Sequence, residues 1–251
     1  MGGKIGLEEY VPGKYTQRKP GAEALVGHYV RIWESRQLAQ KEADCEATAL
    51  ADLPPCIAFS RKIGVGALEI ADMVAQRLGY KVADRKLLEQ IANQTNISEK
   101  AVAYFDERFP GYVNRTFKYL FGEKAFTDSD YSRHLISAVF AIAGLESTVF
   151  VGRGAHLILP RERVLAVRCI GSDDYRAKRI AEIMHISRSE ARKKLPGLDK
   201  EQAAFFKKVF AKDEAPAYEF DMVINLDHFT NPGDVADIAT LAFNKKFKTA
   251  G

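Results

Sequence analysis

Residues 56–71 read CIAFSRKIGVGALEIA, and this stretch decides the fold. Its first four residues are apolar and predict a short buried strand at 56–59. Gly64 and Gly66 then open a turn, and the pattern after them predicts a helix over residues 66–78. Glycine lets a backbone approach a ligand closely, while the first turn of a helix offers free N–H groups and a positive dipole. The stretch therefore has the outline of a phosphate-binding loop, with a tight turn that binds no ligand as the other interpretation.

The residue after Gly66 departs from the common form of such a loop. In the motif G-x-x-x-x-G-K-[ST] a lysine and a hydroxyl residue follow the second glycine, and both contact phosphate or its metal ion. This chain has Ala67, Leu68 and Glu69 there. As a bare motif, the loop is thus incomplete.

Downstream of this loop, strand-like and helix-like segments alternate along the chain. The strands are expected at 80–83, 148–152, 163–170 and 221–226. Strands separated by helices predict an α/β fold, with a mainly parallel sheet covered by helices on both faces. Near the end, Ser187 is expected to cap a helix and Pro196-Gly197 to end it. Asp199 is expected to cap the helix after that.

The first 53 residues differ in character from the rest. Glycines, prolines and mixed charges over residues 1–22 predict a loosely ordered, flexible arm. The helix expected after it has four apolar or aromatic residues on or near one face: Leu25, Tyr29, Ile32 and Trp33. Such a face predicts docking on the main domain or, in a homodimer, on a second subunit. Because Pro54-Pro55 marks a boundary, we expect an extension over 1–53 and a main domain over 54–251.

The composition narrows the class of protein. Of 251 residues, 47% are hydrophobic and 28% are charged, a balance that excludes a mainly disordered chain. The formal net charge of +4 suits binding of phosphorylated small molecules and of nucleic acid alike. Three cysteines that lie far apart, without a CxxC pair or a Cys/His cluster, favour a reduced cytoplasmic protein with no zinc site. No apolar run approaches the ~20 residues of a membrane span.

Beyond the loop, three groups of residues stand where a parallel sheet holds its ligands, next to the carboxyl ends of predicted strands. Asp84 can accept hydrogen bonds from a base or a sugar, although capping of the next helix explains it nearly as well. Arg153 lies between two glycines in VGRGAH, a setting suited to bidentate phosphate binding, with a surface ion pair as the alternative. Arg176 and Arg179 are three residues apart and so share one helix face.

Together these features resemble the cytidylate kinase-like branch of the P-loop nucleoside monophosphate kinases, over about residues 56–247. The loop of that branch looks like S-R-x-x-G-S-G-G-x-x-I-A, and this chain matches it at Ser60, Arg61, Gly64, Gly66, Ile70 and Ala71. The segments YKVADRKLL, VFVGRGA and SDDYRAKRI resemble further motifs of the branch in the same order. The absent lysine is a trait that the chain shares with this branch.

The resemblance implies an ATP-dependent kinase that phosphorylates a nucleoside monophosphate, with CMP or dCMP as the expected acceptor and Mg²⁺ as a cofactor. The implied fold is a P-loop NTPase-type sheet with an insert that binds the monophosphate and a helical lid at about 180–215. Asp84 and Arg153 would face the acceptor, and Arg153, Arg176 and Arg179 would stabilise the charge of the transferring group. ATP would lie on the loop, at Ser60, Arg61, Lys62, Gly64, Val65, Gly66 and Ala67.

The chain also departs from the branch. Ala67 and Leu68 replace a second glycine and an arginine, Gln202 replaces an arginine of the lid, and Val151 replaces an acidic residue of true cytidylate kinases. Positive charge could instead come from Lys62, Lys200 or Lys207. The departures keep a second hypothesis open, in which the protein is a nucleotide-binding sensor or regulator without turnover.

A third hypothesis is an RNA-binding module that uses the basic and aromatic residues 115–124, on which bases could stack. Packing of those aromatic side chains in the core or in the substrate domain is the favoured interpretation. We therefore expect small-molecule nucleotides, and no nucleic acid or membrane, as partners. A steep loss of RNA affinity with salt would be needed to revive the RNA hypothesis.

Overall fold

A computed structural model describes residues 22–39, 53–94, 99–101, 103, 130–213 and 215–247. Within these ranges, five strands form one parallel sheet in the order β2-β3-β1-β4-β5. The strands are β1 (Cys56–Arg61), β2 (Lys81–Ala83), β3 (Thr148–Val151), β4 (Val164–Ile170) and β5 (Met222–Asn225). The sheet confirms the predicted α/β class, and the expected strands are all present with shifted ends.

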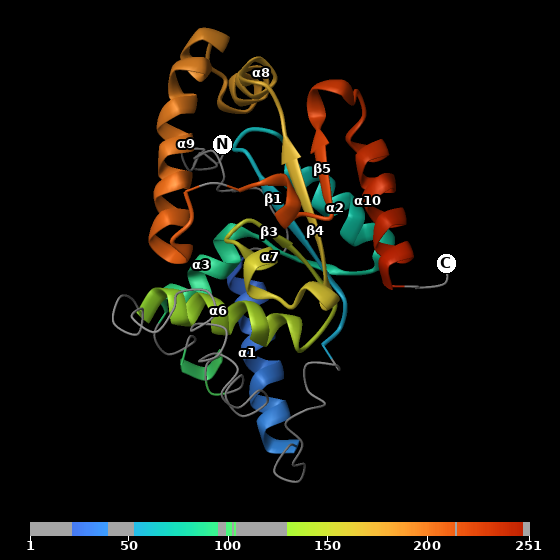
Figure 1. Cartoon of the computed structure of the whole chain (residues 1–251). Coiled ribbons are helices and arrows are strands. Elements are labelled where there is room, and N and C mark those ends of the chain that lie inside the picture. The colour runs from blue at the N-terminus through green and yellow to red at the C-terminus, as the bar shows by residue number, and fades with distance from the viewer. Residues whose placement is uncertain are drawn as a thin grey trace, which may run out of the picture.

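Helices separate the strands along the chain (Figure 1). The helices before β3 are α1 (Ala22–Ala39), α2 (Ala67–Leu78), α3 (Arg85–Asn93) and α6 (Asp130–Ala143). Those after it are α7 (Ala155–Ile158), α8 (Asp173–Met184), α9 (Arg188–Phe210) and α10 (Pro232–Phe247). Short 3₁₀ turns lie at Arg161–Arg163, Ala217–Glu219 and Leu226–His228.

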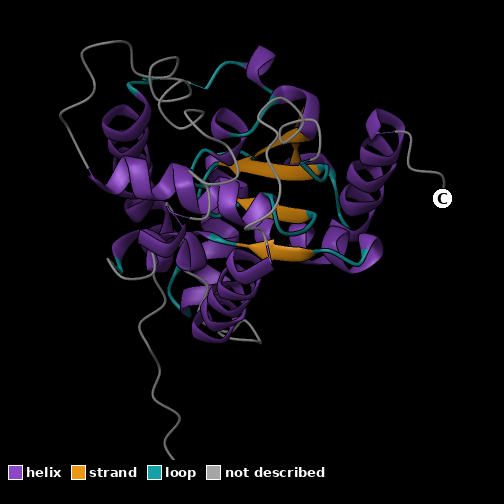
Figure 2. Ribbon diagram, turned by 90° about the horizontal axis from the view of Figure 1, so that it is seen from below, coloured by secondary structure: helices purple, strands orange, loops and turns teal. Residues whose placement is uncertain are grey.

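Alternation of side chains along each strand divides the interior into two cores. In β1, Cys56 and Ala58 belong to a core completed by α1, α3, α6 and α7. Ile57 and Phe59 belong to the other core, against α2 and α10. Figure 2 shows the strands enclosed between these helices. Because both faces are covered, the strands are mainly apolar, as expected for a parallel sheet.

The order of the strands places a ligand site at the end of β1. From β1 the chain moves outward to β2, returns through β3, and then crosses to β4 on the other side of β1. Parallel α/β sheets bind their ligands outside the carboxyl ends of the strands, where the order reverses in this way. The glycine loop follows β1 at this point, and α8 and α9 lie beyond the same edge of the sheet (Figure 1).

The helix α1 docks on the main domain. Val26, Tyr29 and Trp33 are almost fully buried in the same core as α3 and α6. Docking on the domain, one of the two predicted alternatives, is therefore what the structure contains, while a homodimer through this helix stays a prediction. The proposed arm at 1–21 and the segment 40–52 lie outside the described residues.

The prediction that Pro196-Gly197 ends a helix is wrong, because α9 continues through both residues to Phe210. Ser187 caps the helix as expected, in a capping box with Glu190. A proline inside a helix costs about 3 kcal/mol, and contacts with α8 offset this cost. Leu195 is buried against α8, and the Asp199 carboxylate, expected as a cap, instead binds an arginine of α8.

The remaining expectations concern the cysteines, a membrane span and the basic aromatic stretch. Cys56 and Cys169 are buried free cysteines, and burial raises the pKa of each thiol to about 12. In the described ranges, no helix is long and apolar enough to cross a membrane. Cys45 and the basic aromatic stretch at 115–124 lie outside the described residues.

Candidate functional site

The loop between β1 and α2 has the geometry of a phosphate-binding turn. Gly64 and Gly66 adopt the left-handed conformation, with φ of 90° and 83°, which most other residues reach only with strain. Gly66 caps α2, and no side chain of a described residue bonds to the first turn of this helix as a cap. The N–H groups of that turn are therefore available to an anion, with the positive end of the helix dipole behind them.

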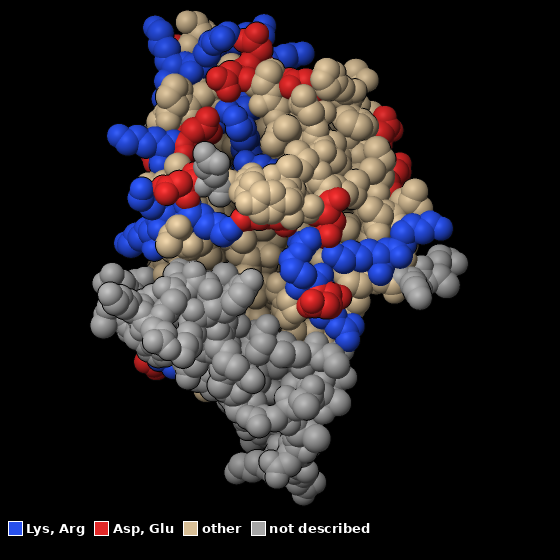
Figure 3. All heavy atoms as spheres, viewed as in Figure 1, with Lys and Arg blue, Asp and Glu red and all other residues tan. Residues whose placement is uncertain are grey.

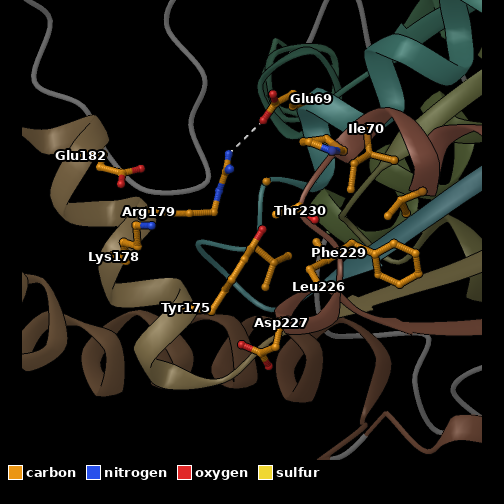
Figure 4. Close-up of a pocket in the computed structure, with 14 residues that line it drawn as sticks. Glu69, Ile70, Tyr175, Lys178, Arg179, Glu182, Leu226, Asp227, Phe229 and Thr230 are labelled. Atoms are coloured by element: carbon orange, nitrogen blue, oxygen red, sulfur yellow. Dashed lines mark hydrogen bonds and ion pairs between the residues drawn. The ribbon is translucent and has the colours of Figure 1, made fainter.

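A first cavity, of about 470 Å³, opens beside this loop. Its walls come from the loop and α2, from α8, and from the segment that joins β5 to α10 (Figure 4). Ile70, Leu226 and Phe229 give it an apolar side. Its charged lining is mixed, with two cations from α8 and three carboxylates: Lys178, Arg179, Glu69, Glu182 and Asp227. A cavity with an apolar wall next to an anion-binding loop has the chemistry that a nucleotide base and its phosphates require.

Arg179 crosses the first cavity to reach the loop. Its Nη2 donates to Oε2 of Glu69 at 3.0 Å, as the dashed line in Figure 4 shows. The guanidinium also lies directly over Gly66, since a Cβ atom on that glycine would come within 2.7 Å of the Arg179 Cζ. The predicted loop residues and this predicted lid arginine are thus brought together.

A second cavity, of about 310 Å³, lies at the ends of β1 and β3, against α9. Three arginines meet in it: Arg61 from β1, Arg85 from the first turn of α3, and Arg153 from the turn after β3. Arg153 has a φ of 51° between two glycines that are also left-handed. Such strain at a residue with a Cβ atom is typical of functional sites.

Several nitrogen atoms of the arginine side chains in the second cavity are buried without a hydrogen-bonding partner. Nε and Nη2 of Arg61 and Nε of Arg153 make no hydrogen bond in the described part of the chain. The carboxylate of Glu89 pairs with both Arg85 and Arg153, and Phe205 stacks 3.9 Å below the Arg153 guanidinium. Burial, followed by the charges of Arg85 and Arg61, lowers the pKa of Arg153 to about 9. An anion in this cavity would relieve both the repulsion and the missing hydrogen bonds.

Arg176 has a different environment from the other predicted arginines. It is fully buried, and its Nε donates to the carbonyl oxygen of Ile63 at 2.7 Å. Its two terminal nitrogens donate to the carboxylates of Asp173 and Asp199 at 2.5 to 3.0 Å. All three nitrogens are thus engaged, and the side chain ties α8 and α9 to the loop. A contact of Arg176 with a phosphate stays a prediction, and it would require some of these bonds to break.

The remaining predicted residues have structural contacts. Asp84 is buried and caps α3, accepting from the Leu87 N–H at 2.9 Å, so capping is the interpretation that the geometry supports. The Ser60 hydroxyl accepts from Arg168 at 3.1 Å, and Lys62 is exposed. Gln202, which replaces a lid arginine, donates to the carbonyl of Arg61 at 2.7 Å.

Two residues of the site were not singled out by sequence reasoning. Arg85 directly follows Asp84 at the end of a strand, and its spacing to Glu89 is that of a helical ion pair, but such pairs are common on exposed helices. Glu69 is recognisable in the sequence only as a departure from the loop motif that favours the sensor hypothesis, and nothing in the sequence links it to Arg179. Figure 3 shows the wider setting, with Lys and Arg gathered over α8 and α9 and few over β5.

Among the described residues, no three His, Cys, Asp or Glu side chains are grouped as metal ligands.

Solved structures are similar to this chain at low sequence identity. An uncharacterized protein from Eubacterium ventriosum aligns with a TM-score of 0.59 and 19% identity, over 76% of this chain and 98% of its own. A shikimate kinase from Bacteroides thetaiotaomicron has a TM-score of 0.40, with 14% identity over 77% of this chain and 98% of its own. A gluconokinase from Sinorhizobium meliloti has a TM-score of 0.44, with 14% identity over 79% and 99%.

No curated protein is significantly similar in sequence. The model of the cytidylate kinase-like family, however, matches residues 56–228, which include the loop, all three arginines of the second cavity, and α8 and α9. That match covers well over half of the chain and agrees with the parallel sheet and the glycine loop after its first strand. The chain therefore belongs to the cytidylate kinase-like family.

Proposed function

We propose that this protein transfers the γ-phosphoryl group of ATP to a small acceptor that already carries a phosphate group. A nucleoside monophosphate of the CMP or dCMP type is the expected acceptor. Membership of a kinase-like family supports phosphoryl transfer in general. The observation that carries the finer proposal is the convergence of Arg61, Arg85 and Arg153 in one cavity beside the loop.

Three arginines favour a phosphate over a neutral acceptor. A guanidinium binds phosphate oxygens through two parallel hydrogen bonds, and each charge-assisted bond contributes about 1.5–3 kcal/mol. The carboxylate of Glu89 offsets part of the positive charge, yet donors on Arg61 and Arg153 stay without a partner in the described chain. An acceptor that offered only a hydroxyl group would leave these buried donors and their mutual repulsion uncompensated.

The first cavity is the expected site of ATP. The N–H groups at Gly66 and the start of α2 suit the phosphates, and the apolar wall at Ile70, Leu226 and Phe229 suits the base. The loop, Ile63–Gly66, lies between the two cavities, since Arg61 and Ile63 line the second and Val65 and Gly66 line the first. ATP and the acceptor would then lie on either side of this loop.

The proposed reaction requires little covalent chemistry from the protein. An oxygen of the acceptor phosphate attacks the γ-phosphorus, the bond to the β–γ bridging oxygen breaks, and ADP leaves with the electron pair. Arg153 orients the acceptor phosphate, while the loop and Arg179 hold the donor in line, and these cations stabilise the developing charge. Mg²⁺, bound mainly through the phosphates, would supply further charge neutralisation.

The test is a screen for phosphoryl transfer from Mg²⁺-ATP to CMP, dCMP, UMP, AMP and GMP, with the nucleoside cytidine as an uncharged acceptor that offers only hydroxyl groups. Diphosphate formation is read by phosphorus NMR. We expect turnover of one monophosphate and a loss of about 100-fold in kcat/KM for that acceptor in Arg153→Ala. Arg192→Ala removes an exposed arginine of α9 that lines neither cavity, and it should change the rate less than twofold.

A nucleotide sensor without turnover is the second candidate, because Glu69 puts a negative charge beside the loop and Arg176 has its donors engaged. The same screen separates the two candidates. Saturable ATP binding without transfer to any acceptor would contradict the kinase proposal and support the sensor. Turnover that survives Arg153→Ala unchanged would contradict the assignment of the second cavity.

A further inference from the structure

The loop lacks the charge that its proposed ligand requires. Ala67 is fully buried at the position where a phosphate-binding loop commonly has lysine. Two residues later, Glu69 places a carboxylate in the first turn of α2. ATP phosphates at this helix end would therefore meet a negative charge on the protein, and a cation must come from another element. The source of this cation matters only if the proposed function, with ATP at this loop, is correct.

The lysines considered from the sequence do not fill this role in the structure. Lys62 and Lys200 are exposed, and Lys207 pairs with Asp213 near the far end of α9 at 2.9 Å. Arg176 lies close to the loop, but its three nitrogens are bonded to Ile63, Asp173 and Asp199. None of these four side chains lines the first cavity, whereas Arg179 does.

Arg179 does reach the start of α2. Its guanidinium contacts Gly66 so closely that any side chain there would overlap it, and its Nη2 is held by Glu69 at 3.0 Å. Its Nε is buried and has no hydrogen-bonding partner among the described residues. The side chain is about one-quarter exposed, so it lies within the cavity instead of extending into solvent.

We propose that Arg179, positioned by Glu69, supplies from α8 the positive charge that phosphate-binding loops commonly carry in their own sequence. Glu69 acts as a positioning residue: it orients the guanidinium over Gly66, and the guanidinium in turn neutralises the carboxylate before phosphate arrives. The remaining N–H groups of Arg179 then donate to phosphate oxygens of ATP.

Contacts between α8 and the glycine loop hold Arg179 in position. Arg176 lies one helical turn before Arg179 on the same face of α8 and bonds to the carbonyl of Ile63. Ile180, the next residue of α8, fills the space beside Gly64, where a Cβ atom would come within 2.9 Å of its Cδ1. Two contacts with the loop thus fix where α8 delivers the Arg179 guanidinium.

The test measures ATP binding to the full chain by isothermal titration calorimetry, with inorganic tripolyphosphate as a probe without a base. We expect Arg179→Ala to weaken the binding of both ligands by about 30-fold, as for the loss of one charge-assisted contact. The double variant Arg179→Ala with Glu69→Gln should bind ATP about fivefold more tightly than Arg179→Ala does, because it removes the carboxylate that Arg179 no longer neutralises. The single variant Glu69→Gln should change the ATP affinity of the protein by less than fivefold.

The control is Arg192→Ala, which removes the same charge from α9 at an exposed ion pair and should change ATP affinity less than twofold. If Arg179→Ala does not fold, Arg179→Lys replaces it, and intermediate affinity is expected because a lysine keeps the charge but not the fork of donors. Tighter or unchanged ATP binding by Arg179→Ala would overturn the inference. So would an effect of Glu69→Gln that is equal in both backgrounds. A chain that binds no ATP would overturn the proposed function itself.

Discussion

The buried side chain of Arg176 gives the most direct test of how α8 and α9 are held to the rest of the protein. Replacement by methionine keeps much of the apolar stem and removes the guanidinium. The structure predicts that this change acts first on stability, because the guanidinium is fully buried and bonded to one carbonyl and two carboxylates.

The size of the effect follows from the exposure of its three partners. The carbonyl of Ile63 belongs to a residue that is only 4% exposed, so losing its charged donor costs about 1–2 kcal/mol. The side chains of Asp173 and Asp199 are 61% and 39% exposed and recover much of their hydration, which limits each of these losses to about 0.5–1 kcal/mol. The free energy of unfolding should therefore fall by about 3 kcal/mol, a drop of roughly 6–12 °C in Tm for a chain of this size.

Differential scanning calorimetry and urea unfolding of Arg176→Met provide the measurement. Arg192→Ala, which breaks only an exposed pair with Asp174, should cost less than about 0.5 kcal/mol. In a double-mutant cycle, Asp199→Asn should lower the free energy of unfolding by less in the Arg176→Met variant than in the unchanged protein. A loss below about 1 kcal/mol in Arg176→Met, or costs that add fully in the cycle, would refute this account of Arg176.

Three further predictions concern the packed interior. Gly154→Ala should lower the free energy of unfolding, measured with urea, by about 2–4 kcal/mol. The reason is that Gly154 has a φ of 72° and a Cβ atom there would overlap the ring of Phe210. A decrease below about 1 kcal/mol would contradict that packing. Trp33→Ala should cost about 3–5 kcal/mol by the same assay, since its ring is 1% exposed; unchanged melting would mean that α1 does not cover the core. Burial, and then nearby cations led by Arg168, lower the pKa of His156 from 6.5 to about 3. The unfolded chain therefore takes up this proton first, and stability should fall by up to ~1.4 kcal/mol per pH unit as pH drops from about 6.5 towards 3. His156→Phe should remove that part of the slope, and an unaltered slope would exclude His156 as its source.

Most of the fold could be predicted because its signals are local. Short apolar runs identify the strands, and Gly64 and Gly66 identify the turn after β1 without any knowledge of distant residues. The continuation of α9 through Pro196 could not be predicted in this way. It depends on the contact of Leu195 with α8 and on the bond between Asp199 and Arg176, which join segments separated in sequence.

The candidate site was predictable only in part, because some of its contacts join residues that are distant in the sequence. Arg153 could be selected because the glycines on either side of it constrain its backbone. Arg85 could not, since a single arginine in a first helical turn has no feature that separates it from a solvated residue. The bond between Glu69 and Arg179 joins positions 110 residues apart, and only the packing of α8 against the loop brings them together.

The location of Trp33 makes the intrinsic tryptophan fluorescence of the protein informative. It is the only tryptophan of the 251 residues, and it lies before the segment that matches the family. It packs in one core with Leu87 and Leu88 of α3, the helix that begins at Arg85 of the second cavity. Tryptophan fluorescence therefore observes α1 and its core and not the edge of the sheet that holds the two cavities. A change in tryptophan emission when a phosphate compound is added would report that occupancy of the cavity is transmitted along α3 to α1.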